Sequence, residues 1–212
     1  MSRCFIAIAG PSGSGKSLFS QTLLDELRAA APNVHVALLK EDAYYRDQSH
    51  KTLEEREAVN YDHPDALEHE LLSEHLQRLR EGKAVDVPVY DYTVHTRATE
   101  VEHVEPAEVI IVEGILLLAS EALRDSFDMR FYMDTALDIC LLRRLDRDMR
   151  ERGRSLESVV TQYQDTVRPM YYRYIRPSAE YADMVITGGG KNRVALDVVR
   201  SVLLERATET RP

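Results

Sequence analysis

Residues 10–17 read GPSGSGKS, which satisfies the phosphate-binding pattern G-x-x-x-x-G-K-[ST] at every fixed position. The glycines of such a loop let backbone N–H groups turn inward around phosphate oxygens. Lys16 would place a positive charge near the β- and γ-phosphates, and Ser17 would offer its hydroxyl to Mg²⁺. The alternative is a glycine-rich turn that only joins a strand to a helix. The pattern favours a site for a nucleoside triphosphate and Mg²⁺, made of Gly10, Pro11, Ser12, Gly13, Ser14, Gly15, Lys16 and Ser17.

Acidic residues follow two apolar runs that have the character of buried parallel strands. Asp42 comes shortly after residues 34–39, and Glu113 comes directly after residues 109–112. The carboxyl ends of parallel strands form the edge at which open α/β sheets bind ligands. We therefore expect Glu113 and Asp42 to join Ser17 at the metal site, and Asp42 to take the proton of an incoming hydroxyl. Asp42 could instead be a helix cap or a solvated side chain, and Glu113 could be a chance acidic residue at a strand end.

Six arginines crowd one further stretch of the chain: Arg143, Arg144, Arg147, Arg150, Arg152 and Arg154. Guanidinium groups match phosphate oxygens and neutralise the charge that develops during phosphoryl transfer. We therefore expect Arg147 and Arg152 to belong to a mobile lid over the transferred group. The alternative is a solvated helix face on which the arginines pair with Asp146, Asp148 and Glu151, at little gain in stability.

Two segments, residues 61–64 and 88–97, carry aromatic and polar side chains without an evident core role. Tyrosines could flank a planar base, His95 could hydrogen-bond to the edge of that base, and Asp62 could bind ribose hydroxyls. Together these side chains would form a nucleoside pocket. Taken singly, Asp62 could be a helix N-cap, the tyrosines could pack on an edge strand, and His95 could be a structural histidine.

The apolar pattern predicts the elements that would position these residues. An apolar run at residues 4–9, helical spacing over 18–27 and a second run at 34–39 form a βαβ unit, which implies a parallel sheet. Further strands are predicted at residues 109–112, 129–133 and 184–186. Helices are predicted over residues 64–82, 135–152, 156–166 and 192–206, the second with Leu137, Leu141, Leu145 and Met149 on its inner face.

Residues 84–104 interrupt the alternation of strands and helices. Apolar residues occupy every second position in each half of this segment, which predicts an antiparallel hairpin at the edge of the parallel sheet. The sequence therefore predicts a single α/β domain over residues 1–212, with the three-layer fold of P-loop NTPases and a central parallel sheet. The hairpin would cover the nucleoside site, and an arginine-bearing helical lid would span about residues 143–168.

The composition narrows the classes of function. The chain of 212 residues has 27 Lys and Arg against 36 Asp and Glu, a formal net charge of −9. This balance disfavours non-specific nucleic-acid binding, which needs a basic surface. The only cysteines, Cys4 and Cys140, lie in apolar runs, and no apolar stretch approaches the roughly 18 residues of a membrane span. We therefore expect a cytoplasmic protein that binds neither nucleic acid nor membranes.

These strings together resemble those of the uridine kinase family, the uridine–cytidine kinases among P-loop nucleoside kinases. The resemblance extends from the first predicted strand to the last predicted helix. It is carried by residues 10–17, 41–45, 60–64, 88–97, 112–116, 147–148, 151–154 and 181–183. It implies transfer of the γ-phosphoryl group of ATP or GTP to the 5′-hydroxyl of uridine or cytidine, in pyrimidine salvage.

The resemblance also implies catalytic roles for individual residues. Asp42 matches the family's catalytic base for the 5′-hydroxyl, and Glu113 matches a carboxylate near the metal. Arg147 and Arg152 match lid arginines that meet the triphosphate, while Lys16 keeps its phosphate role. These matches agree with the chemistry expected from the residue types alone.

The same resemblance assigns the nucleoside pocket. Asp62 matches the carboxylate that binds ribose hydroxyls, assisted by Arg144 and Gln162. Many relatives have phenylalanine at one or both ring-flanking positions, so each tyrosine hydroxyl here needs a polar partner. Tyr90 and His95 match the residues that read the edge of the base. Tyr61 and Tyr92 match the residues that flank its ring, and Arg154 lies nearby.

Relatives of this group assemble as tetramers and are inhibited by UTP or CTP. Because of the resemblance, we expect both properties in this protein.

One rival interpretation is another small-molecule kinase on this fold, such as phosphoribulokinase or pantothenate kinase. The string at residues 90–97 disfavours it. A second rival is a nucleotide-binding regulator without activity, which is disfavoured because Lys16, Ser17, Asp42 and Glu113 are all present.

Overall fold

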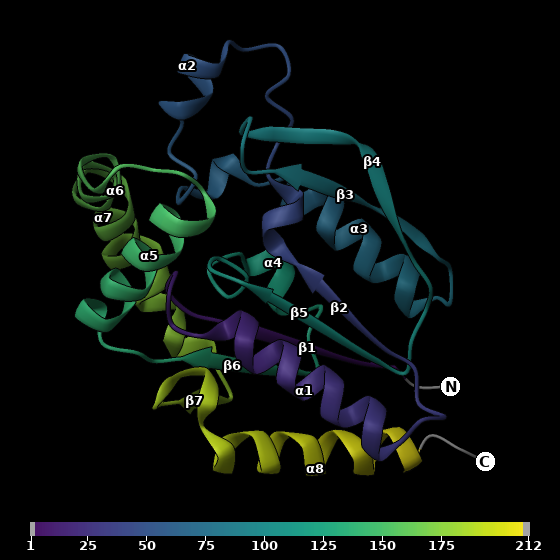
Figure 1. The fold of residues 1–212 in the computed structure, drawn as a ribbon. Coiled ribbons are helices and arrows are strands. Elements are labelled where there is room, and N and C mark those ends of the chain that lie inside the picture. The colour runs from purple at the N-terminus through teal and green to yellow at the C-terminus, as the bar shows by residue number, and fades with distance from the viewer. Residues whose placement is uncertain (1–2, 210–212) are drawn as a thin grey trace.

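Five parallel strands form the central sheet of the structure, a computed structural model that describes residues 3–209 (Figure 1). The strands are β1 (Cys4–Ala9), β2 (Val36–Lys40), β5 (Val109–Gly114), β6 (Met129–Met133) and β7 (Met184–Ile186). Their spatial order is β2-β5-β1-β6-β7, so β2 lies at one edge and β1 at the centre. The predicted strands and the parallel sheet are thereby confirmed.

The central strand is buried on both faces because its residues are apolar throughout. Successive side chains of a strand point to opposite faces of the sheet. Phe5 and Ala7 accordingly belong to the core on one face, whereas Ile6 and Ile8 belong to the core on the other. A continuous apolar run is what a strand between two helical layers requires.

Two long helices cover one face of the sheet. They are α1 (Lys16–Ala30) and α8 (Arg193–Glu209), which lie side by side in Figure 1. Phe19, Leu23 and Leu27 recur at helical spacing on α1 and are buried against the strands. The buried residues of α8 in the same core are Leu196, Val199, Leu203 and Ala207.

The other face carries α3 (His69–Arg80), the hairpin strands β3 (Val85–Asp91) and β4 (Thr96–Val104), and the short helix α4 (Glu121–Arg124). Leu72, Leu76 and Leu79 of α3 pack in the core of this face. The predicted hairpin is confirmed, but it forms a separate two-stranded sheet and does not extend the central one. The result is a three-layer α/β domain. Within residues 3–209, no helix has the length and apolarity needed to cross a membrane.

The helix predicted from residue 64 begins later than expected. Pro64–Ala66 forms a single 3₁₀ turn, and Leu67 returns to extended backbone before α3 starts at His69. Leu67 forms an isolated bridge with Tyr45, and the Glu68 N–H donates to the Tyr44 carbonyl. These tertiary contacts interrupt the helical pattern that the leucines alone suggest.

The inner face predicted for α5 (Leu137–Glu151) is correct only in part, since Leu137 packs against the core. Leu137, Leu141 and Leu145 are only half-buried, and Met149 is 45% exposed. The fully buried residues of α5 are Cys140, Arg144 and Asp148. The helix turns this largely polar face inward because it borders the ligand cavities described below.

The helix predicted over residues 156–166 is the first part of a longer helical stretch. After α6 (Leu156–Gln162), the chain continues through wider π turns at Tyr163–Val167 and Tyr171–Ile175, on either side of α7 (Arg168–Met170). Pro169 lacks an N–H and cannot continue the regular α-helical ladder, which accounts for wider turns beside it. A 3₁₀ turn at Pro177–Tyr181 ends the stretch. The short helix α2 (Leu53–Glu57) was not predicted, although its capping box, made by Thr52 and Glu55, matches the sequence pattern T-x-x-E.

Candidate active site

The glycine-rich loop joins β1 to α1 at the centre of the sheet, as the motif requires. Gly13 and Gly15 have φ angles of 85° and 100°, in the left-handed region that favours glycine. A Cβ on Gly13 would lie 2.4 Å from the Cys140 carbonyl oxygen, so α5 also leaves no room for a side chain there. Glycine is therefore required in this loop for two reasons, the left-handed backbone and the close approach of α5.

Lys16 and Ser17 begin α1 inside this loop. The Lys16 ammonium donates to the Pro11 carbonyl at 3.0 Å, and the Ser17 hydroxyl donates to Glu113 Oε1 at 2.7 Å. Burial lowers the pKa of Lys16 and raises the pKa of Glu113, and the opposite charge of each residue partly offsets the shift of the other. The predicted phosphate lysine and the two predicted metal ligands thus lie together.

A cavity of about 530 Å³ opens above the loop. Its lining includes Lys16, Ser17, Asp42, Glu113, Arg147 and Gly190. Among residues 3–209, no three His, Cys, Asp or Glu side chains cluster so as to hold a metal by themselves. Hydroxyl and carboxylate oxygens nevertheless suit Mg²⁺, which kinases hold through one or two protein ligands together with substrate phosphates. The residues present therefore fit a magnesium triphosphate.

Asp42 lies in a 3₁₀ turn, Glu41–Tyr44, that follows the edge strand β2. The neighbouring carboxylate of Glu41 is fully buried, with Oε2 accepting from the Leu116 N–H at 2.9 Å and Oε1 lying 2.9 Å from His69 Nε2. These contacts fix the turn to the end of β5 and to α3. Sequence reasoning assigned no role to Glu41, although its place directly after a strand could have drawn attention to it.

A second cavity, of about 60 Å³, adjoins the first. It is lined by all eight residues predicted to bind the nucleoside: Tyr61, Asp62, Tyr90, Tyr92, His95, Arg144, Arg154 and Gln162. Asp42, Ser12, Ile115 and Arg147 line both cavities. Ligand pockets typically measure roughly 300–1,000 Å³, so this cavity must widen to admit a nucleoside.

The aromatic wall of the second cavity is built from rings that contact one another. The rings of Tyr61 and His95 lie 5.6 Å apart at 24°, and the Tyr61 hydroxyl donates to the His95 carbonyl at 3.2 Å. His95 has a φ of 52°, the only positive value outside glycine among residues 3–209. Burial first, and then the charge of Arg154, lower the pKa of His95. Its imidazole is therefore neutral near pH 7 and can either donate or accept.

Asp62 is not the helix cap that was considered as an alternative. The His63 side chain accepts from the Asp65 N–H at the start of the Pro64 turn, whereas Asp62 is buried in the cavity wall. Burial raises the pKa of Asp62, and the nearby Arg144 guanidinium opposes this rise. A buried carboxylate beside a cavity needs a polar partner, which ribose hydroxyls could supply.

The arginines divide between the site and the solvent. Arg144 and Arg147 both approach the Ser12 hydroxyl, at 3.2 and 3.5 Å, and Arg150 pairs with Asp146 on the exposed face. Arg152 lines the second cavity and does not reach the first. Five of the six arginines thus line one or both of the two cavities, and the solvated-face alternative holds for Arg150.

Asp148, which sequence reasoning treated only as a surface partner, is buried beside the arginines of the candidate site. Its carboxylate is fully buried and lies 2.9 Å from Arg147, 3.4 Å from Arg144 and 3.4 Å from Arg152. Burial raises the pKa of Asp148, but Arg147 and Arg144 outweigh this effect and hold the pKa below its ordinary value. The i, i±4 spacing of Asp148 from Arg144 and Arg152 is the signal that could have revealed it.

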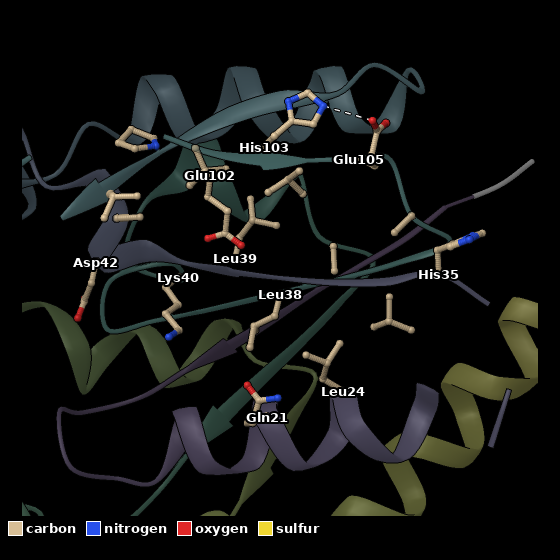
Figure 2. Close-up of a pocket in the computed structure, with 18 of the residues that line it drawn as sticks. Gln21, Leu24, His35, Leu38, Leu39, Lys40, Asp42, Glu102, His103 and Glu105 are labelled. Atoms are coloured by element: carbon tan, nitrogen blue, oxygen red, sulfur yellow. Dashed lines mark hydrogen bonds and ion pairs between the residues drawn. The ribbon is translucent and has the colours of Figure 1, made fainter. Parts of the chain in front are cut away.

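A further cavity, about 750 Å³, is a groove that runs along the edge strand β2 between α1 and the hairpin (Figure 2). Leu38 and Lys40 line it on the side of β2, and Glu102 and His103 line it on the side of β4. Asp42 lies at one end of the groove in Figure 2. The hairpin thus stands apart from β2 along the groove and meets the active site only near its turn.

The fold and the two adjoining cavities define a phosphotransferase of the P-loop kinase class. The chain belongs to the Phosphoribulokinase / Uridine kinase family, since the family model of that description matches residues 5–195. The uridine kinase of Escherichia coli strain K12 is 54% identical over 196 residues, 92% of each protein. The uridine kinase of Cronobacter sakazakii is 53% identical over 196 residues, again 92% of each protein.

Solved structures share the fold at lower identity. Phosphoribulokinase from Rhodobacter spheroides is 14% identical with a TM-score of 0.66, covering 88% of this chain and 70% of that chain. D-glycerate 3-kinase from Cryptococcus neoformans is 16% identical with a TM-score of 0.62, covering 88% of this chain and 86% of that chain. These likenesses concern the fold alone.

Proposed function

We propose that this protein is a uridine kinase, which transfers the γ-phosphoryl group of ATP or GTP to the 5′-hydroxyl of uridine or cytidine and yields UMP or CMP. The observation that carries the proposal is the position of Asp42, which lines both the cavity above the glycine-rich loop and the cavity lined by the eight nucleoside residues. A hydroxyl bound in the second cavity would therefore face a phosphate bound in the first. The two relatives named uridine kinase support the choice of acceptor.

In this reaction Asp42 accepts the proton of the attacking hydroxyl. Lys16 and Arg147 stabilise the charge on the transferred phosphoryl group, because both line the first cavity. Arg152 would join them when residues 143–168 close as a lid, since its guanidinium now lies over the Tyr92 ring, 4.2 Å from its centroid. Positioning and charge neutralisation supply nearly all of the catalysis in such phosphoryl transfers.

Mg²⁺ would be held by Ser17, Glu113 and Asp42, which all line the first cavity. When bound, it neutralises charge on the β- and γ-phosphate oxygens. The hydrogen bond between Ser17 and Glu113 keeps the two oxygens close in its absence. Because burial raises the pKa of Glu113, a nearby cation would favour its ionised form.

The nucleoside would be read by the second cavity. Asp62 would bind the ribose hydroxyls, and Gln162 would orient Arg144, which donates to it at 2.8 Å. Uracil O4 accepts a hydrogen bond whereas cytosine N4 donates one, and a neutral His95 could serve both by changing tautomer. The base-edge reader Tyr90, the ring-flanking Tyr61 and Tyr92, and Arg154 complete this assignment.

By resemblance to the family, we further propose a cytoplasmic homotetramer that acts in pyrimidine salvage. The net charge of −9 and the absence of a basic surface pattern in the sequence support a small-molecule substrate over nucleic acid. Sedimentation velocity of the purified protein would test the tetramer, with a single species near four times the chain mass as the expected result.

An ADP-release assay with ATP and Mg²⁺ tests the proposed reaction. Uridine, cytidine, ribulose 5-phosphate and pantothenate would be compared as acceptors. We expect turnover with uridine and cytidine and background rates with the other two. Turnover only with ribulose 5-phosphate or pantothenate would favour another kinase of this fold, and no turnover with any acceptor would favour a regulator without activity.

A further inference from the structure

The hydroxyl of Tyr92, at the turn end of the hairpin, donates a hydrogen bond to Asp42 Oδ2 at 2.8 Å. Among residues 3–209, this is the only hydrogen bond that the Asp42 carboxylate receives. The bond joins two segments that lie 50 positions apart in the chain, the turn after β2 and the inserted hairpin. The predicted catalytic base is therefore oriented by a residue that was expected only to flank the substrate's ring.

The Tyr92 ring is itself held on two sides. The Arg152 guanidinium lies over one face, 4.2 Å from the ring centroid. The Tyr90 ring meets it edge-on, with centroids 5.2 Å apart and an interplanar angle of 81°. A ring packed in this way aims its hydroxyl in a fixed direction, so the bond to Asp42 constrains the carboxylate more than a mobile donor would.

The other ring-flanking tyrosine makes no such contact. The Tyr61 hydroxyl donates to the backbone carbonyls of Arg56 and His95, at 3.0 and 3.2 Å. Both tyrosine hydroxyls have thus found the polar partners they need, but of the two it is Tyr92 whose partner is a carboxylate of the candidate site. The two residues thus differ in their hydrogen-bond partners, although they were assigned the same role.

We infer that Tyr92 is a positioning residue for phosphoryl transfer, whose hydroxyl holds Asp42 through Oδ2 and leaves Oδ1 to accept the proton of the nucleoside hydroxyl. This inference rests on the proposed function. A general base must lie within hydrogen-bond reach of the proton that it removes, and misplacing it slows the chemical step more than binding. The contribution of Tyr92 should therefore appear in kcat, and it should depend on Asp42.

A double-mutant cycle with uridine as acceptor tests the inference. Tyr92→Phe keeps the ring and removes the hydroxyl, so we expect kcat to fall about tenfold while the KM for uridine stays within about twofold. In an Asp42→Asn background, Tyr92→Phe should cause less than about a twofold further loss, because the group it positions is already gone. The control Tyr174→Phe removes a hydroxyl that lies 3.0 Å from His63 Nε2, outside the cavity, and should leave kcat unchanged.

Three results would overturn the inference while leaving the proposed function intact: an unchanged kcat in Tyr92→Phe, a loss confined to KM, or the same tenfold loss in both backgrounds. A parent chain that does not phosphorylate uridine would overturn the proposed function itself. The hydrogen bond can be measured without turnover, from the ¹³C resonance of the Asp42 carboxyl at one fixed pH in the ligand-free protein. We expect Tyr92→Phe to shift this resonance and Tyr174→Phe to leave it in place, and an unmoved resonance in Tyr92→Phe would contradict the inference.

Discussion

Three guanidinium groups converge on the buried carboxylate of Asp148, and this arrangement explains how a cluster of arginines can be kept beside an anion site. Arg144, Arg147 and Arg152 lie 2.9–3.4 Å from it. One negative charge leaves a net positive charge of two among these four residues. The arginines are thereby ordered before a ligand arrives, and the cluster still attracts phosphate.

His95 provides a prediction at the residue scale. Its neutral imidazole lines the second cavity, proposed to bind the nucleoside, and does not line the first cavity, above the glycine-rich loop. We expect His95→Ala to lower kcat/KM for uridine about tenfold, the loss of one buried hydrogen bond, with little change in the KM for ATP. Steady-state kinetics across uridine, cytidine and adenosine would measure it.

His103→Ala is the matched control, because His103 lies on the same hairpin and outside the nucleoside cavity, paired with Asp86 at 2.8 Å. The control should keep the parent's preference among nucleosides. A His95→Ala variant with the parent's preference would show that His95 has only a structural role.

Residue types and spacing predicted much of the candidate site. They could not predict which acidic side chains are buried. The glycine-rich loop and the eight residues that line the second cavity were picked out because their chemistry is local or because they match the family by resemblance. Glu41 and Asp148 were not, because a carboxylate that is 0% exposed looks the same in a sequence as one on the surface. Whether an acid is solvated or buried is set by the elements packed around it.

At the scale of elements, the turn Glu41–Tyr44 determines where Asp42, the proposed catalytic base, lies. Glu41 locks this turn against the end of β5, where Glu113 also lies. Gly114 permits the contact, since a Cβ there would lie 2.3 Å from Glu41 Oε2 and 2.4 Å from Glu41 Cβ. Asp42, the proposed base, and Glu113, the proposed metal ligand, are thus held near each other by a close approach of two segments.

Gly114→Ala should therefore displace the turn. We expect the free energy of unfolding to fall by about 1–3 kcal/mol, as for overpacking elsewhere, and kcat to fall at least tenfold. Urea denaturation and uridine turnover would measure the two effects. Gly82→Ala is the control: its φ of 84° makes alanine unfavourable too, but the nearest atoms belong to the flexible end of Arg3. Gly82→Ala should lose stability and keep kcat, whereas a parent-like kcat in Gly114→Ala would contradict the role of the contact.

Helices and strands were predicted correctly where burial alone determines which residues are apolar. Continuous apolar runs fixed the strands, because a strand between two layers must be apolar on both sides. The inner face of α5 was mispredicted in part because that helix serves the ligand cavities, and its buried face carries Arg144 and Asp148. The start of α3 was mispredicted because Leu67 is drawn into a bridge with Tyr45, a contact between distant segments.

At the scale of the whole molecule, the site forms where separate parts of the chain end at one edge of the sheet. β1 delivers the glycine-rich loop, β2 delivers Asp42 and β5 delivers Glu113. The inserted hairpin and α5 then supply the aromatic and cationic walls. The proposed phosphate and nucleoside sites are adjacent because the parallel strands place their carboxyl ends together.

The stability of the folded chain should depend on pH through His75. This histidine is buried on α3, with Nδ1 3.1 Å from the Tyr44 hydroxyl, and burial lowers its pKa. The unfolded chain therefore binds a proton more readily than the folded chain, so stability is lost as pH falls below about 6.5. We expect the loss between pH 7.5 and 5.5 to be smaller in His75→Gln by up to about 1 kcal/mol. Urea denaturation of both proteins at both pH values would measure it, and equal losses would contradict the prediction.

The most direct test of the account is Asp42→Asn, because the amide keeps the shape of the side chain and cannot take the proton. We expect kcat for uridine to fall by about 10²–10⁴-fold, while the Kd for uridine measured by calorimetry stays within about threefold. An Asp42→Asn protein that still phosphorylates uridine at the parent's rate would contradict the assignment of Asp42 as the base between the two cavities.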